Sequence, residues 1–184
     1  MILNARNDTF TFFFPIKFVP DWVNERYAPY LNKMPGNLIT KPIDLINYGV
    51  QSLNLPGAAF TPVEQVGKHG RIRTYRDAKP EQELLSKELT VTIQMLDGYI
   101  NYWMMLDIFS HWYGFEESST HLPEGTAIRI HDSEGLTIVT IQMKRMLFTE
   151  IGAIDMSFSN NELTFSTFDC TFSYNELYTN VDLD

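Results

Sequence analysis

The 184-residue sequence contains one cysteine, Cys170, and has no lysine or arginine after Arg145. A single cysteine excludes an internal disulfide framework and fits a reducing compartment. No run of about 18 apolar residues occurs, so no membrane span is expected. The first eight residues lack the basic and apolar segments of a signal peptide. Cys170 stands between Phe168 and Phe172, which favours a small core residue over a nucleophile.

The motifs that usually mark catalysis are missing as well. There is no glycine-rich phosphate loop, no Gly-x-Ser-x-Gly elbow and no His-Glu-x-x-His pair. His111, His121 and His131 stand ten residues apart, a spacing that matches no common set of metal ligands. Ordinary polar or partly buried histidines are therefore favoured. We expect a protein that is not an enzyme and that holds neither a cofactor nor a metal.

Composition points to one globular domain that is rich in aromatic residues. The chain is 44% apolar and 14% aromatic, with a formal net charge of −9. A chain of this length can bury a core, and aromatic side chains serve interfaces as well as cores. The negative charge disfavours binding to nucleic acid or to anionic membranes. We expect a single domain over residues 1–184.

The C-terminal quarter alternates apolar and polar residues, as strands with one buried and one wet face do. After Arg145 its charged residues are all carboxylates: Glu150, Asp155, Glu162, Asp169, Glu176, Asp182 and Asp184. Such a wet face repels phosphate, which suits a surface that nucleic acid passes without adhering. The simpler interpretation, that these charges keep a sheet soluble, stays open.

Residues 9–19 predict a strand with apolar side chains at period two. These side chains are Phe10, Phe12, Phe14, Ile16 and Phe18. Because Pro15 cannot donate a ladder hydrogen bond, the strand should lie at a sheet edge or break there. Residues 21–31 predict a short helix that begins near Asp21 and ends early at Pro29.

Residues 58–85 form a long polar segment with a dense group of basic residues. These are Lys68, Arg71, Arg73, Arg76 and Lys79. Residues 71–76 alternate as a strand would, which favours a projecting β-arm over disorder. Three interpretations stay open: a solvated loop, a docking arm for an acidic surface on another subunit, and a phosphate-binding loop. The acidic remainder of the chain favours the docking arm.

Residues 97–113 predict the main helix, with Asp97 as its N-cap and Gly114 as its stop. Aromatic and aliphatic side chains surround most of it, among them Tyr102, Trp103, Leu106, Phe109 and Tyr113. A helix that is apolar on most sides is buried or lies in an interface. One sheet could hardly cover so much surface, so we expect a neighbouring subunit to do so.

The remaining strands predict hairpins. Residues 127–131 and 136–148 flank the turn 132–135, and residues 153–158 and 163–174 flank Asn160-Asn161. In the last strand Phe165 is out of phase, which suggests a bulge or burial on both sides of the strand. With strands at 48–53 and 89–95, the pattern predicts a mainly β fold of the α+β class. We expect a β-barrel or sandwich with one main helix at its side and a long projecting arm.

The order of these elements has a counterpart in a known family. A strand leads into Leu55-Pro56-Gly57, and the polar arm and the alternating strand 89–95 follow. Then come an aromatic helix that ends in Phe109-Ser110-His111-Trp112 and a closing Phe-x-Cys-x-Phe-x-Tyr strand over 168–174. From about residue 50 onward, this order resembles the tail tube proteins of contractile-tail bacteriophages. That family shares its fold with the tube protein of type VI secretion systems.

The resemblance implies a structural virion protein that forms hexameric rings, which stack into a hollow tail tube. DNA would pass through the tube without specific binding, and the channel would be lined by residues such as Asp155, Glu162 and Asp169. The arm would contact the next subunit, and the main helix would pack outside the barrel. Implied partners are further copies of the chain, the tail sheath, the baseplate and the tail terminator, with no membrane. Assembly would take place in the host cytoplasm.

Residues 1–47 exceed what a minimal tube subunit needs, so we regard them as an N-terminal extension. Their presence keeps open a role as a tube initiator or as a baseplate hub component of the same fold. A small β-rich virion enzyme that acts on glycans is a further alternative, and it would need two carboxylates that converge in a cleft. A monomeric binding module would instead show a ligand groove and a helix buried within one chain.

Overall fold

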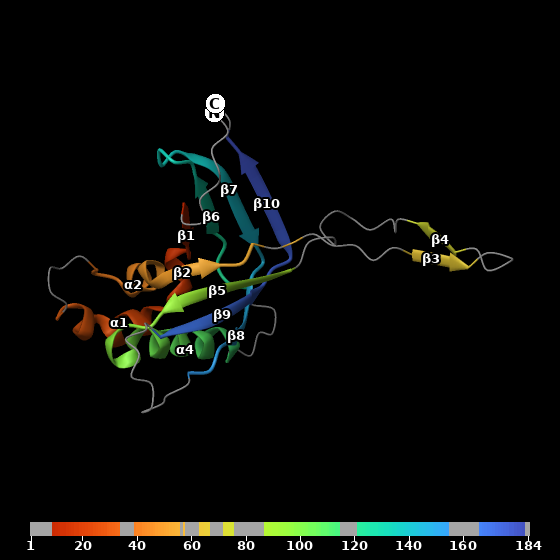
Figure 1. Ribbon diagram of the computed structural model, residues 1–184. Helices are drawn as coiled ribbons and strands as arrows, with labels where there is room; N and C mark the ends of the chain where they lie inside the picture. The colour runs from red at the N-terminus through yellow and green to blue at the C-terminus, as the bar shows by residue number, and fades with distance from the viewer. Residues whose placement is uncertain are drawn as a thin grey trace.

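The computed structural model describes residues 9–33, 39–55, 57, 63–66, 72–75, 87–114, 121–154 and 166–182. Two antiparallel four-stranded sheets form its body, and their strands cross at a steep angle (Figure 1). Sheet A has the order β1 (Phe10–Phe13), β6 (Thr126–His131), β7 (Thr137–Lys144) and β10 (Glu176–Val181). Sheet B has the order β2 (Val50–Leu53), β5 (Glu88–Gln94), β9 (Thr167–Ser173) and β8 (Leu147–Ile151). The predicted mainly β fold with one long helix is confirmed.

Two sharp corners carry the chain from one sheet to the other. Between β7 and β8 the backbone of Arg145 is left-handed, with φ 52°. Between β9 and β10 the N–H of Asn175 bonds to the carbonyl of Lys144, so the two corners lie side by side. Orthogonally packed sheets turn their corners in this way. The single strand predicted over residues 136–148 is therefore wrong, and β10, which follows the second corner, was not predicted.

The core joins the N-terminal segment to sheet B through stacked aromatic rings. Phe14 stacks on Phe18 with centroids 4.3 Å apart, and Phe148 stacks on Phe172 at 4.5 Å. Phe14 also lies 5.3 Å from Phe172, which links the two pairs. Such ring pairs add to the free energy gained by burying their area. The described part of the N-terminal extension is thus built into the core.

The first strand follows only half of its predicted pattern. β1 ends at Phe13, before Pro15, and lies at the edge of sheet A as the proline required. A 3-10 turn (Ile16–Phe18) then turns Phe18 into the core and leaves Ile16 exposed. The prediction that Ile16 shares the buried face is wrong, because the turn breaks the period of two.

Helix α1 (Asp21–Leu31) begins where predicted but does not end at Pro29. Val23, Tyr27 and Leu31 are buried along one face of it. Packing of the buried Leu31 stabilises the last turn of the helix. Pro29 has no N–H, so one carbonyl in the preceding turn lacks its helical partner. Because Pro29 is exposed, water can bond to that carbonyl. Helix α2 (Pro42–Gly49) was not predicted, and it includes the first two residues of the strand expected at 48–53.

The main helix, α4 (Ile100–Tyr113), is preceded by a separate 3-10 turn (Asp97–Tyr99). Gly98 and Tyr99 are both left-handed, with φ of 68° and 56°, so they separate Asp97 from the helix. The predicted N-cap is therefore wrong. Asn101 anchors the helix start instead, because its buried amide accepts from the N–H of Leu96 and donates to the carbonyl of Gln94.

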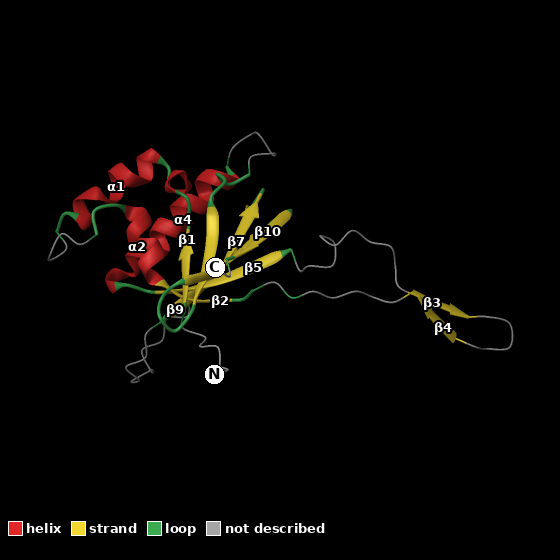
Figure 2. Ribbon diagram, turned by 90° about the horizontal axis from the view of Figure 1, so that it is seen from above, coloured by secondary structure: helices red, strands yellow, loops and turns green. Residues whose placement is uncertain are grey.

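Helices α1, α2 and α4 gather on one side of the sheets (Figure 2). Met104, Met105 and Ile108 of α4 are fully buried among the sheets and the N-terminal helices. The cover that we expected from a neighbouring subunit thus comes largely from this chain's own α1 and α2. No helix in the described ranges is long and apolar enough to cross a membrane.

Within the predicted arm, β3 (Val63–Val66) and β4 (Ile72–Tyr75) form a two-stranded antiparallel hairpin. It is drawn apart from the two larger sheets in Figures 1 and 2. The strand predicted over residues 71–76 is confirmed. The hairpin predicted around Asn160-Asn161 and the phase of Phe165 fall outside the described residues.

Candidate functional site

One side of sheet B carries mainly polar side chains, and we call it the polar face. On β5 it carries Glu88, Thr90, Thr92 and Gln94, and the register places these opposite Ser173, Thr171, Asp169 and Thr167 of β9. The alternate residues of both strands, such as Val91 and Cys170, are fully buried on the other side. Period-two alternation thus gives sheet B one dry and one wet side.

Hydrogen bonds between neighbouring strands tie the side chains of the polar face together. The hydroxyl of Thr92 donates to Oδ1 of Asp169 at 2.7 Å, and Gln51 of β2 donates to Oε1 of Gln94 at 2.7 Å. On β8, the Thr149 hydroxyl donates to the carbonyl of Thr171 at 2.9 Å. The hydroxyls of Thr92 and Thr149 already donate within the sheet, so they are not offered to a passing phosphate.

The charge of this face has one sign. The four strands of sheet B contain no lysine or arginine, and their carboxylates are Glu88, Glu150 and Asp169. All three are exposed. A sheet lined by hydroxyls, amides and scattered carboxylates repels a polyanion at short range and offers it no counter-charge.

The sequence picked out only part of this face. Asp169, one of the three predicted channel residues, lies on it, whereas Asp155 and Glu162 fall outside the described residues. Thr90, Thr92 and Gln94 were not singled out, although their strict alternation with buried aliphatic residues was visible. Their partnership with β9 is a long-range pairing that a local pattern does not reveal.

The residues of the predicted docking arm are only partly described. Lys68, Arg71, Arg76 and Lys79 lie outside the described ranges, and Arg73 stands in β4 opposite Gln65 of β3. Val66 and Ile72 pair directly across the hairpin, and they are 71% and 62% exposed. The hairpin therefore carries an exposed apolar pair.

The predicted interface residues of α4 divide between two environments. Tyr102 meets Phe168 edge to face at 5.2 Å, and Phe109 meets Phe148 in the same way at 5.0 Å, so both point toward sheet B. Leu106 is partly buried. Trp103 is 48% exposed and is the residue of this set that is most available to a partner.

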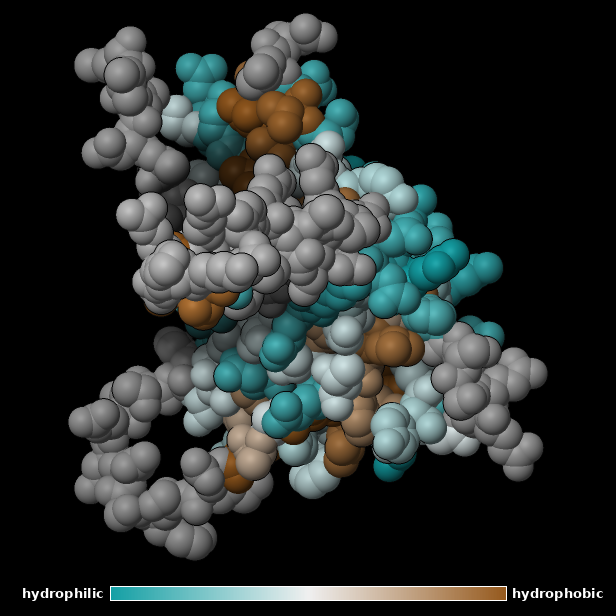
Figure 3. Space-filling view, turned by 90° about the vertical axis from the view of Figure 1, so that its right-hand side faces the viewer, coloured by the Kyte–Doolittle hydropathy of each residue, from teal (hydrophilic) through white to brown (hydrophobic). Residues whose placement is uncertain are grey.

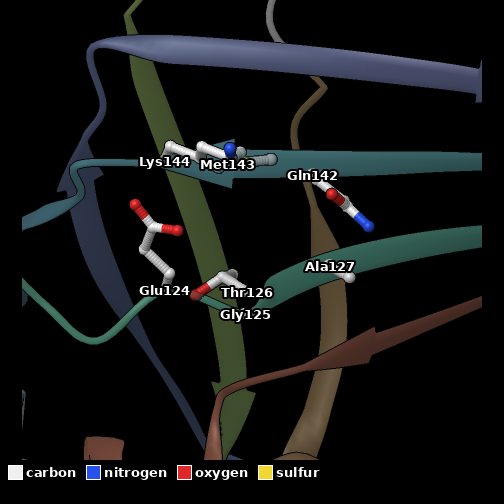
Figure 4. A pocket seen from close by; sticks show the side chains of 7 residues that line it. All are labelled: Glu124, Gly125, Thr126, Ala127, Gln142, Met143 and Lys144. Carbon is white, nitrogen blue, oxygen red and sulfur yellow. The ribbon is translucent and has the colours of Figure 1, made fainter.

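A cavity of about 340 Å³ lies where β6 begins and β7 ends (Figure 4). It is lined by Glu124, Gly125, Thr126, Ala127, Gln142, Met143 and Lys144. Glu124 is the one carboxylate of this lining, so the cavity lacks the paired carboxylates that glycoside hydrolysis requires. The glycan-acting alternative finds no site in this cavity.

His111 and His131 lie in separate surroundings. Nδ1 of His111 accepts from Nε1 of Trp22 at 3.3 Å, and His131 lies between the hydroxyls of Thr11 and Thr137. Among the residues that the structure describes, no group of three or more potential ligands could hold a metal. Cys170 is fully buried, as predicted, and burial raises the pKa of its thiol.

No protein-family model matches the chain, and no curated protein matches its sequence. Solved structures do match. A chain in the anti-feeding prophage cap, a tube-terminating cap, is 10% identical over 72% of this chain and 80% of its own, with a TM-score of 0.49. A chain in the sheath/tube terminator of an extracellular contractile injection system is 9% identical over 72% and 85%, with a TM-score of 0.48. A chain in the anti-feeding prophage baseplate is 11% identical over 72% and 79%, with a TM-score of 0.47.

These neighbours come from the class of assembly to which the sequence resemblance points.

Proposed function

We propose that this chain is a structural subunit of the tube in a contractile tail or injection apparatus. Copies close into rings, the rings stack into a hollow tube, and the polar face of sheet B lines the channel. The chain acts by its shape and charge and carries out no catalysis. Nucleic acid, or another polyanion, passes through the channel without adhering to its wall.

The observation that carries the proposal is the two-sided character of sheet B. One side, with Thr92 and Asp169 at its centre, bears hydroxyls, amides and carboxylates and no cation. The other side is closed off by sheet A and the three helices. A ring that turns the polar face inward therefore keeps its helices outside, where Trp103 is free to meet an enclosing protein.

The edge strands of sheet B support the closure of several copies into a ring. β2 and β8 form the two edges of sheet B, so among the residues that the structure describes each has a partner strand on one side only. Unpaired edges of this kind favour association with a further strand, and a closed ring removes them. The same chemistry makes an isolated subunit prone to assemble.

Electron microscopy of the concentrated, purified chain tests the proposal. Rings or hollow tubes are the expected result, and sedimentation velocity should show the matching large species. Rings that never stack would identify an initiator or an end piece of the tube instead. Monomers alone, at every concentration up to the limit of solubility, would contradict the proposal.

A further inference from the structure

The cavity where β6 begins and β7 ends contains a buried hydroxyl group that lacks a hydrogen-bond partner. Thr126 lines this cavity and is 1% exposed. Among the residues that the structure describes, no group bonds to its Oγ1. Nearly all buried hydroxyls have a partner, because an unpaired one has lost its bonds to water without replacing them. A polar ligand in the cavity would supply the missing bond.

The ammonium group of Lys144 lies at the same cavity with no carboxylate paired to it in the described part of the chain. Glu176 stands directly opposite Lys144 across β7 and β10. Its carboxylate is engaged elsewhere, since Oε2 accepts from the hydroxyl of Tyr178 at 2.8 Å and Oε1 lies 3.8 Å from Nε of Arg145. Nζ of Lys144 lies 4.9 Å from the centre of the Tyr178 ring, which holds the ammonium in place without neutralising it.

A carboxylate completes the polar lining of this cavity. Glu124 is exposed, and within the described ranges it forms no ion pair, with Lys144 or with any other cation. The bond to Glu176 raises the pKa of Tyr178 and the nearby charge of Glu124 raises it further, so Glu124 approaches the tyrosine that holds Lys144. Figure 4 shows Glu124, Thr126 and Lys144 around one end of the cavity, while Gln142 lies farther along β7.

The exposed apolar side chains of β10 and of the turn before β7 lie at the other end of these strands. Leu136 is 65% exposed and Val181 is 54% exposed. Figure 3 shows hydrophobic side chains gathered at the upper end of the molecule, where these residues lie. At the cavity end, β7 finishes with Lys144 and β10 begins with Glu176, and both are charged. The surroundings of the cavity therefore suit a polar ligand.

We propose that this cavity binds a small zwitterion of the α-amino acid class. The carboxylate of the ligand pairs with Lys144, its ammonium group pairs with Glu124, and a polar group of its side chain bonds to Thr126. Opposite charges in one site recognise both ends of a zwitterion and disfavour a ligand that carries only one of its charges. The volume of about 340 Å³ has room for such a molecule. The site goes beyond the proposed function and does not depend on tube formation.

Equilibrium dialysis of the full chain against labelled L-serine tests the proposal. L-Serine is the probe because it carries a carboxylate, an ammonium group and a hydroxyl. Two analogues each lack one charged group: 3-hydroxypropionate has no ammonium, and ethanolamine has no carboxylate. Binding of L-serine should be saturable, and each analogue should compete only at about tenfold higher concentration or more, because it forgoes one charge-assisted contact.

Substitutions in the cavity locate the binding. Lys144→Met and Glu124→Gln should each weaken the binding of L-serine by about tenfold or more. Neither side chain is fully buried, so both variants should fold. The matched controls, Lys41→Met and Glu25→Gln, remove the same charges at exposed positions away from the cavity and should bind as the parent does. Thr126→Val should weaken the binding of L-serine but not that of L-alanine, which has no hydroxyl.

Absence of saturable L-serine binding at concentrations up to about 50 mM would overturn the proposal. Competition by both analogues as strong as that of L-serine itself would also overturn it, as would unchanged binding in both cavity variants. Rings or tubes that bind no L-serine refute this site alone. Binding of L-serine by a chain that never forms rings supports the site and contradicts the tube.

Discussion

The hydroxyl of Tyr27 on α1 donates a hydrogen bond of 2.6 Å to Oδ2 of Asp107 on α4. Arg26 approaches the same oxygen at 2.9 Å. Asp107 is the only residue of α4 with a full charge at neutral pH, since its other residues are apolar or neutral. The main helix thus uses its one carboxylate to hold the N-terminal helix in place.

Tyr27→Phe should lower the free energy of unfolding by about 1–2 kcal/mol, because it removes a hydrogen bond to a charged acceptor at a buried site. Urea denaturation measures the change. The matched control is Tyr48→Phe on the exposed side of α2, which should stay within about 0.5 kcal/mol of the parent. Equal effects of the two substitutions would show that the bond to Asp107 contributes nothing.

The same contact predicts a dependence on alkaline pH. Burial, followed by the bond to Asp107, raises the pKa of Tyr27 far above its ordinary value of 10.0. The contribution of Tyr27 to stability is therefore fully present below pH 10.0 and falls as the pH rises above it, because the unfolded chain ionises first. Between about pH 9 and pH 11 the parent should lose more stability than Tyr27→Phe. Parallel losses in the two proteins would disprove the assignment.

Phe18→Ala tests whether the N-terminal segment belongs to the core. Phe18 is fully buried and stacks on Phe14 at 4.3 Å, so its truncation should cost about 3–5 kcal/mol in the free energy of unfolding. Ile16→Ala, in the same 3-10 turn but exposed to solvent, should change stability by less than about 0.5 kcal/mol. Similar small losses for both would mean that this segment is a dispensable appendage.

Asp169→Lys tests the charge of the proposed channel. Tubes of the variant should form as before, but they should retain a labelled oligonucleotide in a form that nuclease cannot digest. Retention should weaken steeply with added salt. Glu25→Lys makes the same charge change on α1, outside the proposed channel, so any oligonucleotide that it binds should be digested. Nuclease-sensitive binding by both variants would place Asp169 outside the channel.

Local patterns predicted the parts of the fold that local interactions decide. The alternation along β5 and the turn 132–135, in which Asp132 bonds to the N–H groups of Glu134 and Leu136, were both legible from a few neighbouring residues. The closing strand was legible in the same way, since Cys170 and its apolar neighbours are all buried.

The features that the sequence did not predict depend on distant partners. Pro29 stays inside its helix because Leu31 is packed, and Arg145 turns a corner because β8 pairs in a different sheet from β7. The left-handed Tyr99 has no sequence signal of its own, since only glycine and a few polar residues usually adopt that conformation.

The candidate site also contains some residues that a local pattern predicts and others that depend on distant partners. Asp169 was predicted to be a channel residue from the charge of its segment. Thr92 was not predicted, because the hydrogen bond between the two joins residues that lie far apart in the chain. The cover of α4 by the N-terminal helices was missed for the same reason. The sequence showed that the helix must be covered, and only the structure shows that α1 and α2 cover it.

The most direct test of the account is a cryo-electron microscopy reconstruction of the assembled protein, resolved well enough to trace the backbone. The account predicts a hollow tube in which the polar face of sheet B lines the channel, with Thr92 and Asp169 directed inward and α1 and α4 on the outside. A channel lined by the helices would contradict it, as would an assembly that buries the polar face between subunits.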